Sequence, residues 1–389
     1  MRPEPELHID AEYVIETLRD LVRINSINPG FSGGTTDEAE VAAYTSRAMQ
    51  QLGMQVSEYS VAPGRPSVVG RVRGGGGPSL MLYAHYDTVG VEGMDDPFGA
   101  AVRDGRVHGR GAYDMKGGLA ACLGAVQALR AAAVAPDGDV VVVAVADEEV
   151  ASLGIQEVLR HVRTDAAVVT EPTELQLCVA HKGFCWINVR TLGEAAHGSR
   201  FDLGVDANMR MGSFLAELGR LEEELRGRPP HAMVGPPSLH AATLQGGTGP
   251  STYAARCDLQ IERRTIPGET AIQAVSEIQA VVDHLSRRDP AFRAELELSL
   301  ARDSFEVPGS AAIARAARTA ATEVLGAAPE EVGQSHWMDA AFLAAAGIET
   351  VIIGPAGAGA HAAVEWVDAA SVVQLSRLLT GMVRTYQQT

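Results

Sequence analysis

The chain has few cysteines, a deficit of basic residues and no long apolar run. Its 389 residues include 4 cysteines without a CxxC spacing, which excludes a disulfide framework and favours a reducing compartment. The 32 Lys and Arg stand against 49 Asp and Glu, and the net charge of −17 argues against binding of nucleic-acid phosphates. The longest purely apolar runs, such as residues 140–146, have the length of a strand, so a membrane-spanning helix is not expected. We therefore expect neither a nucleic-acid nor a membrane partner.

The remaining composition is that of an ordinary globular protein. Hydrophobic residues make up 46% of the chain and charged residues 21%, which is enough to build a core. Residues 1–6 carry no apolar segment, so we expect no signal peptide and a cytoplasmic location. A length of 389 residues is long for a single core and predicts two domains.

The first part of the chain alternates between strand-like and helix-like segments. Continuous apolar runs at residues 80–84, 140–146 and 166–169 are typical of strands that are buried on both faces. Residues 116–130, rich in Ala and Leu, form a predicted helix between the first two of them. This alternation predicts an α/β domain with a mostly parallel sheet and helices on both of its faces.

The pattern changes after residue 181. Predicted elements then follow one another in the order β-α-β-β-α-β, which is typical of a ferredoxin-like α+β domain. They are a strand at 183–191, a helix at 204–226, strands at 239–244 and 254–263, a helix at 269–286 and a strand at 294–300. We therefore predict a catalytic domain formed by residues 1–181 and 303–389, with residues 182–302 inserted as a lid or dimerisation domain.

Acidic residues and a histidine follow the predicted buried strands of the first domain. In open α/β sheets, ligands bind at the carboxyl ends of the strands, so side chains placed there are candidates for a site. They are His85 and Asp87 after 80–84, Glu148 and Glu149 after 140–146, and Glu171 after 166–169. Asp114 lies in the glycine-rich turn at residues 109–118, and His361 comes late in the chain. Their joint position predicts a hydrolytic metal site.

Five of these residues are candidate metal ligands, namely His85, Asp114, Glu149, Glu171 and His361. A catalytic zinc ion takes three protein ligands and leaves one position open, so five ligands are too many for one ion. If one carboxylate bridges two ions, each ion receives three ligands, as in two-metal hydrolases. Two dications also offset the three carboxylates, which would otherwise repel one another.

The motifs together resemble a known family. They are HxD at residues 85–87, GRGxxDMKGG at 109–118, DEE at 147–149, EPT at 171–173 and a late histidine in a GP…AH…E segment. In this order they are similar to the co-catalytic zinc hydrolases that include acetylornithine deacetylase, succinyl-diaminopimelate desuccinylase, aminoacylase-1 and glutamate carboxypeptidase. The resemblance extends from about Val14 to Leu379. It implies two divalent metal ions, zinc in the first place, with cobalt or manganese as alternatives.

The resemblance also implies how the candidate ligands divide between the two ions. Asp114 would be the bridging carboxylate. His85 and Glu171 would complete one site, and Glu149 and His361 would complete the other. Each ion would then have three protein ligands.

Two further acids of the same motifs receive roles from the resemblance. Asp87 would orient the imidazole of His85, which it can reach because residues two apart on a strand share a face. Glu148 would be the general base that activates the metal-bridging water and passes the proton to the leaving amine. The family also suggests a cis peptide bond between Asp114 and Met115.

In the predicted lid, the resemblance implies roles for three residues. His197 matches the family histidine that stabilises the oxyanion, often from a partner subunit; a loop histidine that caps the next segment is the alternative. Arg264 matches the arginine that binds a substrate carboxylate, although it and its neighbour Arg263 could both face solvent. Ser251 stands where many relatives carry a substrate-contacting asparagine, and Glu262 replaces a usual aspartate. Both departures concern the substrate rather than the metal chemistry.

The leading functional prediction is hydrolysis of the amide bond of an N-acyl amino acid, as in acetylornithine deacetylation or desuccinylation. A carboxypeptidase or dipeptidase that acts on small peptides is the alternative, and a non-catalytic metal-binding homologue is a third possibility. His336, Trp337 and Asp339 are candidates to line a specificity pocket, with packing as the other role of Trp337. We expect a small-molecule substrate and a homodimer that forms through the lid domain.

Overall fold

The computed structural model describes residues 7–388, which form two compact units. The first unit contains the chain up to Val179, the segment Val307–Val332 and the chain from Met338 onward. The second unit contains Ala180–Glu306 together with Gly333–Trp337. The domain limits given above rest on the sequence pattern and remain a prediction.

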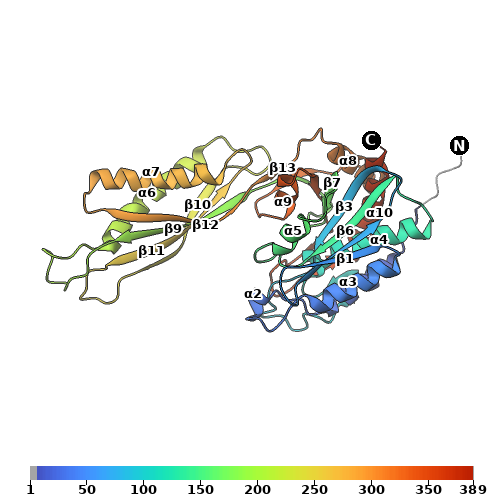
Figure 1. The fold of residues 1–389 in the computed structure, drawn as a ribbon, viewed down its shortest axis with the longest axis horizontal. Coiled ribbons are helices and arrows are strands. Elements are labelled where there is room, and N and C mark those ends of the chain that lie inside the picture. The colour runs from blue at the N-terminus through green and yellow to red at the C-terminus, as the bar shows by residue number, and fades with distance from the viewer. Residues whose placement is uncertain (1–6, 389) are drawn as a thin grey trace. The chain divides into compact units, whose positions relative to one another are not determined.

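The main sheet has nine strands, most of them in the first unit, and its central strands run parallel (Figure 1). The strands are β1 (Gln55–Ser60), β2 (Pro66–Val72), β3 (Gly77–His85), β6 (Gly138–Val145), β7 (Ala166–Val169), β8 (Leu177–His181), β13 (Phe305–Glu306), β14 (Glu331–Gln334) and β15 (Glu349–Ile352). Their order is β1-β2-β6-β3-β7-β15-β8-β13, and β14 pairs with β8. Parallel pairing joins β3 to β6 and to β7, and β7 to β15, whereas β1 and β2 are antiparallel. The mostly parallel central sheet confirms the predicted fold class of this part of the chain.

The central strands consist of apolar residues that are buried on both faces of the sheet. Every residue of the runs 80–84, 140–146 and 166–169 is fully buried. Burying one Val or Leu side chain contributes roughly 1.5–3 kcal/mol, so these three runs are a large part of the core of the unit. Helices cover both faces of a parallel sheet, which explains why the apolar pattern of these strands is continuous rather than alternating.

Eight α-helices of the first unit surround this sheet. They are α1 (Ala11–Arg23), α2 (Pro29–Ser32), α3 (Ala39–Gln51), α4 (Gly117–Ala131), α5 (Leu153–Val158), α8 (Ala312–Leu325), α9 (Ala340–Ala345) and α10 (Ala369–Gln387). α4 and α10 pack on each other and on β3, and α3 contacts β1 and β2. α4 packs so closely that a Cβ on Gly118 would lie 2.3 Å from the hydroxyl oxygen of Thr170. This close contact fixes the chain directly before Glu171.

A small antiparallel sheet joins two distant segments of the first unit. It contains β4 (Ala101–Arg103), β5 (Arg106–His108), β16 (Gly357–Ala358) and β17 (Trp366–Asp368), in the order β16-β17-β5-β4. Asp104 and Gly105 connect β4 to β5 with φ angles of 50° and 74°, the left-handed region that a tight hairpin requires. Pairing of β5 with β17 places the glycine-rich turn beside the histidine loop, which we define as residues 357–365. The sheet was not predicted, although Asp-Gly between two short apolar-polar segments is a hairpin signal.

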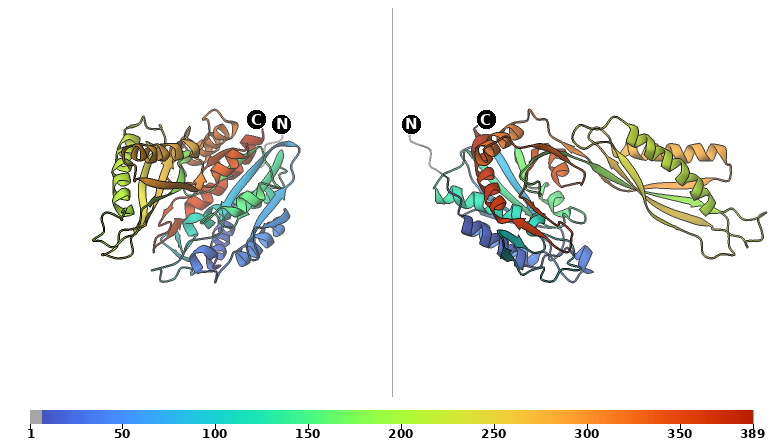
Figure 2. Two further views of the ribbon diagram at one scale, coloured as in Figure 1. Left: turned by 60° about the vertical axis from the view of Figure 1, so that its left-hand side comes forward. Right: turned by 180° about the vertical axis from the view of Figure 1, so that it is seen from behind.

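The second unit is a four-stranded antiparallel sheet with two helices on one of its faces (Figure 2). Its elements are β9 (Gly183–Leu192), α6 (Ala207–Gly227), β10 (Ser238–Gly246), β11 (Arg256–Thr265), α7 (Ala271–Arg288) and β12 (Arg293–Arg302). The strand order is β10-β11-β9-β12. Cys185, Ile187 and Val189 of β9 are buried against the helices, while the residues between them are more exposed. This arrangement confirms the predicted ferredoxin-like α+β architecture.

The part of the chain that the structure describes contains no helix long and apolar enough to cross a membrane. Its cysteines, Cys122, Cys178, Cys185 and Cys257, are all buried, and none of them forms a disulfide.

Candidate metal centre

The carboxyl ends of three neighbouring parallel strands bring the predicted ligands together. β3 ends at His85, and β6 and β7 pair with β3 on either side and run in the same direction. The chain that leaves β6 carries Glu148 and Glu149, and the chain that leaves β7 carries Glu171. These side chains therefore meet at one edge of the sheet, as the strand pattern predicts.

Asp114 lies between two imidazoles, and each imidazole faces a different oxygen of its carboxylate. Oδ1 of Asp114 is 3.2 Å from Nε2 of His85, and Oδ2 is 3.4 Å from Nε2 of His361. Oε1 of Glu171 is 3.6 Å from the same nitrogen of His85, and Oε2 of Glu149 is 3.1 Å from that of His361. The five predicted ligands thus fall into two groups that share Asp114. The peptide bond between Asp114 and Met115 is cis.

Glu148 lies beside the group that contains His85. Its Oε2 is 4.0 Å from Nε2 of His85, and donor atoms of His85, Glu148 and Glu171 all lie within 4.8 Å of one another. The side chain of Glu148 is 11% exposed and that of Glu171 6%, whereas His361 is 56% exposed. The donor cluster is therefore closed on the side of the sheet and open on the side of His361.

The electrostatics of the cluster show a surplus of negative charge. Burial raises the pKa of Glu148 and of Glu171 well above the usual range. Burial acts to raise the pKa of Asp114 as well, but hydrogen bonds with His361 and His85 outweigh it, and the pKa is lowered. Hydrogen bonds with Asp114 and Glu149 raise the pKa of His361 to about 10. Buried carboxylates at this density call for cations to balance them.

Asp87 connects the turn that carries Glu148 to strand β3. Its buried carboxylate accepts the backbone N–H groups of Glu148 and Glu149 at 3.1 and 3.2 Å. Nδ1 of His85 lies 3.6 Å from Oδ1 of Asp87 and 3.1 Å from its backbone oxygen. The side-chain amide of Asn28 donates to Oδ2 at 2.8 Å. Asp87 therefore contacts both the imidazole and the Glu148 turn, and its role in orienting His85 stays a prediction.

A buried ion network behind this turn has no counterpart in the sequence analysis. Arg65 donates to Glu38 at 2.5 Å and to Asp147 at 2.7 Å, and Asn28 donates to Asp147 at 3.0 Å. Asp147 has a φ of 69°, an unusual value that this network holds directly before Glu148. These residues are distant in sequence, and although Asp147 belongs to the DEE motif, nothing in that motif indicates its partners Arg65 and Asn28.

Asp339 is a further buried acid that interacts with the cluster. Its side chain is fully buried and accepts a hydrogen bond from the hydroxyl of Tyr83. Burial raises the pKa of Asp339 to about 6. The charge of Asp339 in turn helps to raise the pKa of Glu148 and of Glu171. Within the segment 336–339, Asp339 is therefore a residue that influences the electrostatics of the predicted ligands.

In the second unit, His197 and Ser251 lie in adjacent exposed segments. His197 forms a β-bridge with Thr252, and the N–H of Gly198 donates to the backbone oxygen of Ser251 at 2.7 Å. Nδ1 of His197 lies 2.8 Å from the hydroxyl of Ser199. The structure thus brings these two predicted residues together.

Arg264 lies toward the other end of the same sheet. Its Nε donates to Glu262 at 2.6 Å, and its guanidinium carbon is 5.2 Å from the ring centre of Phe184. β11 runs from Arg256, where it pairs with the end of β9 that leads to His197, to the end that carries Arg264. The eight residue steps from position 256 to position 264 span roughly 26 Å at about 3.3 Å per step. Within one chain, the structure therefore separates Arg264 from His197.

Arg263 and Trp337, both in the second unit, have packing roles. The side chain of Arg263 is 1% exposed and forms an ion pair with Glu269 at 2.9 Å, so it does not face solvent. The indole N–H of Trp337 donates to the backbone oxygen of Asp303 at 3.0 Å, and its ring lies edge-on to that of Phe184 at 6.2 Å. Packing is thus the observed role of Trp337 within the second unit.

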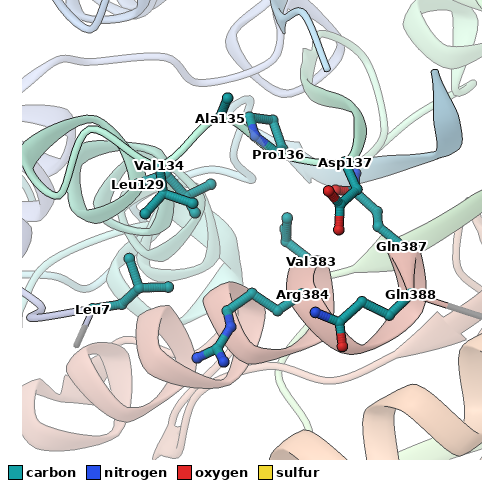
Figure 3. A pocket seen from close by; sticks show the side chains of 10 residues that line it. All are labelled: Leu7, Leu129, Val134, Ala135, Pro136, Asp137, Val383, Arg384, Gln387 and Gln388. Carbon is teal, nitrogen blue, oxygen red and sulfur yellow. The ribbon is translucent and has the colours of Figure 1, made fainter. Parts of the chain in front are cut away.

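Figure 3 shows a hollow of about 180 Å³ elsewhere in the first unit. Leu129, Val134 and Val383 are among its apolar lining residues, and Arg384 and Gln388 are among its polar ones. The segment that precedes β6 contributes to it, whereas the ligands follow the opposite end of that strand. None of the predicted site residues lines this hollow.

A model of the peptidase family M20/M25/M40 matches residues 81–385. The match includes most of the chain and the whole cluster described above. The chain belongs to this family. Membership in family M20/M25/M40 confirms the resemblance seen in the motifs and establishes the chain as a hydrolytic enzyme.

Relatives of known activity support this assignment over most of the chain. An acetylornithine deacetylase from Myxococcus xanthus is 30% identical over 321 residues, which cover 80% of this chain and 82% of the relative. An N-formyl-4-amino-5-aminomethyl-2-methylpyrimidine deformylase from Halalkalibacterium halodurans is 27% identical over an alignment of 405 positions, gaps included, which covers 96% of this chain and 94% of the relative.

Solved structures of family members share the fold at lower sequence identity. Aminopeptidase PepT from Bacillus cereus has a TM-score of 0.82 at 18% identity and covers 97% of this chain and 99% of its own. The Bacillus subtilis YXEP protein, described as a dinuclear metal-binding peptidase from family M20, has a TM-score of 0.76 at 16% identity, with 97% and 99% covered. These likenesses establish the fold of the M20/M25/M40 chain.

The donor set of this family member fits divalent cations. It combines imidazole nitrogens with carboxylate oxygens, which are the ligands that zinc and its neighbours among the divalent metals accept. Burial raises the pKa of Glu148 and Glu171 most, and nearby negative charges add to this effect; two dications would balance those charges. The cluster is therefore a candidate metal site.

Proposed function

We propose that the chain hydrolyses the amide bond of an N-acyl amino acid and releases a carboxylate and a free amine. The observation that carries this proposal is the position of Asp114, whose two oxygens face two separate donor groups. Beside them, Glu148 provides one carboxylate more than the two groups require. This surplus carboxylate supports a role in proton transfer, because a general base must lie close to the reacting centre.

His85, Asp114 and Glu171 would hold one metal ion, and Asp114, Glu149 and His361 would hold the other. Zinc is the proposed metal, with cobalt or manganese as alternatives. When bound, such ions polarise the amide carbonyl and make a water more acidic.

Glu148 takes a proton from the attacking water as the water oxygen bonds to the amide carbon. It then gives this proton to the nitrogen as the carbon–nitrogen bond breaks, so that the amine leaves in neutral form. Asp87 keeps the Glu148 backbone in place through the hydrogen bond at 3.1 Å. The burial that raises the pKa of Glu148 also favours a carboxyl that can hold the proton between the two transfers.

The names of the relatives and the predicted lid residues support an N-acyl amino acid as the substrate. The two relatives above are named for removal of an acetyl and a formyl group, which favours N-acyl substrates over peptides. Arg264 would bind the carboxylate of the amino acid, because the guanidinium is 30% exposed and stacks on Phe184. Ser251 would contact the substrate in place of an asparagine. The peptidase names of the structural neighbours keep a carboxypeptidase or dipeptidase as the second candidate.

We also propose a homodimer that forms through the second unit. The edge strand β10 is exposed over most of its length and carries no charged residue, so its free edge is suited to pair with another chain. A small substrate held by Arg264 cannot reach His197 of the same chain over this sheet, which supports a site completed by the partner subunit's His197. The buried cysteines, which form no disulfide, support a cytoplasmic location.

The function is tested by a hydrolysis panel on the metal-free protein, with and without added zinc, cobalt or manganese. N-acetyl, N-succinyl and N-formyl amino acids are compared with dipeptides, and Glu148→Gln serves as the control. We expect metal-dependent hydrolysis of at least one N-acyl amino acid. Hydrolysis of the dipeptides alone would replace the proposal with the peptidase alternative. Two bound metals without any hydrolysis would indicate a non-catalytic homologue.

The dimer is tested by light scattering and by mixing two inactive variants. His197→Ala and Glu148→Gln are each expected to be inactive as homodimers. In a mixed dimer, one site combines an intact Glu148 with an intact His197 of the partner subunit, so activity should return. A fully active monomer, or mixtures without activity although mixed dimers form, would contradict the proposal.

A further inference from the structure

Glu365 is a buried carboxylate that the proposed reaction does not use. It lies four residues after His361, and its side chain is 0% exposed. Its Oε1 accepts the backbone N–H groups of Tyr113 at 2.9 Å and Asp114 at 3.1 Å. Its Oε2 accepts that of Gly111 at 3.0 Å. Three N–H groups of the glycine-rich turn, including that of Asp114 itself, thus point at one carboxylate.

Arg110 supplies the fourth donor to this carboxylate. Its Nη1 is 2.6 Å from Oε2 of Glu365, and its side chain is 3% exposed. Its Nε donates to the backbone oxygen of Gly90 at 2.9 Å, and its Nη2 donates to that of Ala362 at 2.9 Å. Since Ala362 directly follows His361, one guanidinium links the glycine-rich turn to the histidine loop.

We propose that Glu365 and Arg110 are positioning residues that hold Asp114 and His361 in the relative geometry needed to bind metal. This proposal rests on the proposed function, because the two held residues are the predicted bridging ligand and a ligand of one ion. Oδ2 of Asp114 and Nε2 of His361 lie 3.4 Å apart, although the residues are far apart in sequence. Asp114 has φ −114° and ψ 98°, and Met115 after it is non-helical as well, so local helix formation does not fix Asp114.

The energetics support a positioning role over a purely stabilising one. A buried ion pair pays a desolvation cost, and apolar residues of similar size often stabilise a fold as well or better. Burial and the nearby charge of Asp114 both raise the pKa of Glu365, so the charged form of this carboxylate is costly to bury. Apolar residues could hold the two segments together, but they could not fix the direction of three N–H groups. Oriented hydrogen-bond partners behind metal ligands commonly set metal affinity.

The test compares Glu365→Gln with the control Asp139→Asn in the full-length protein. Gln keeps one oxygen but replaces the other with an NH2 group, which cannot accept from Gly111 or Arg110. Asp139→Asn weakens another ion pair of the same unit, with Arg71 at 2.6 Å, at the opposite end of β6 from the ligands. The metal-free proteins are titrated with Co²⁺ and followed by visible absorption and calorimetry, while circular dichroism reports the fold.

We expect Glu365→Gln to fold, to bind Co²⁺ about 10–100-fold more weakly and to change the Co²⁺ absorption spectrum, whereas Asp139→Asn leaves both unchanged. A folded Glu365→Gln with the affinity and spectrum of the unmodified protein would overturn the proposal. If Glu365→Gln does not fold, Arg110→Lys decides, because it keeps the charge and loses the link to Ala362. Reduced affinity in that variant supports the proposal, and unchanged affinity overturns it.

Measuring hydrolysis beside Co²⁺ binding distinguishes failure of the proposed function from failure of the positioning role. Weaker Co²⁺ binding by Glu365→Gln, with no hydrolysis of any amide by the unmodified protein, would contradict the proposed function and support the positioning role. Hydrolysis by the unmodified protein with unchanged Co²⁺ binding in the variants would do the reverse. An unmodified protein that binds no divalent metal would overturn both.

Discussion

The two units place their predicted site residues in opposite surroundings. In the first unit, the carboxylates of the cluster are at most 17% exposed, and hydrogen bonds from distant parts of the chain hold the turns that carry them. In the second, His197 and Ser251 are exposed, and the described partner of the His197 ring is Ser199, two residues away. Metal ligands need fixed mutual distances, whereas substrate-binding side chains need access. Under the proposed function, the reaction chemistry would lie in the cluster of the first unit, and substrate recognition would fall to exposed residues of the second.

The largest effect is expected from Asp114→Ala. This variant removes the carboxylate whose two oxygens lie 3.2 Å from His85 and 3.4 Å from His361, so neither ion should be retained. Hydrolysis should fall toward the uncatalysed rate, by about 10⁶-fold or more. Metal content by elemental analysis and turnover of the best N-acyl substrate check this. Two retained ions in a folded variant would contradict the bridging role.

His197→Ala is expected to reduce kcat by about 10²–10³-fold with KM little changed, because it removes one donor to the developing oxyanion. Metal content should stay at the level of the unmodified protein. His284, an exposed histidine on α7 of the same unit, provides the matched control His284→Ala. Equal, small effects of both substitutions on kcat would show that His197 has only the local capping role.

Arg264→Ala is expected to raise KM by about 10–100-fold with a small change in kcat, because a charge-assisted hydrogen bond to a carboxylate contributes about 1.5–3 kcal/mol. Arg264→Lys should recover little, since an ammonium lacks the planar fork. Arg190→Ala is the control, because Arg190 is an exposed arginine of β9 that is paired with Asp258. The same KM for Arg264→Ala and Arg190→Ala would place the substrate carboxylate elsewhere.

The smallest effect is expected from Asp165→Asn, at the end of β3 and β7 remote from the ligands. Hydrogen bonds from the backbone and hydroxyl of Ser79 lower the pKa of Asp165 below its ordinary value of 3.8. A lowered pKa stabilises the fold at pH values above 3.8, and this contribution is lost as the pH falls through the folded-state pKa. Because Asp165 is exposed, the free energy of unfolding at pH 7 should fall by less than about 1 kcal/mol.

Chemical denaturation of Asp165→Asn and of the unmodified protein across pH measures this difference. It should shrink as the solution is acidified, while kcat and metal content at pH 7 stay unchanged. A loss of metal would show that the two ends of these strands are coupled.

Local sequence pattern was enough to predict the elements with continuous or alternating burial. The apolar runs 80–84, 140–146 and 166–169 predicted parallel strands, and the β-α-β-β-α-β order predicted the second unit. Placement of acids after such strands predicted their convergence, because parallel strands end at one edge of a sheet. The sequence also indicated that Ser251 stands where many relatives carry an asparagine, but it did not indicate how this difference changes the substrate.

The supporting contacts could not be predicted, because they join segments that are distant in sequence. Nothing local to Arg65 indicates that it pairs with Glu38 and Asp147, and nothing near Arg110 indicates its pair with Glu365. Short strands such as β16 have too few residues for a periodic pattern. Glu365 did belong to the GP…AH…E segment, so an acid at a fixed distance from a ligand was its one available signal.

The proposed site holds two metal ions beside a separate general base, and the variant Glu148→Gln separates metal binding from proton transfer. Metal content and hydrolysis are measured on the same preparation, reconstituted with zinc. The account predicts two ions per chain, as in the unmodified protein, and a kcat reduced by about 10²–10⁴-fold. Unchanged hydrolysis by Glu148→Gln, or the loss of an ion together with activity, would contradict it.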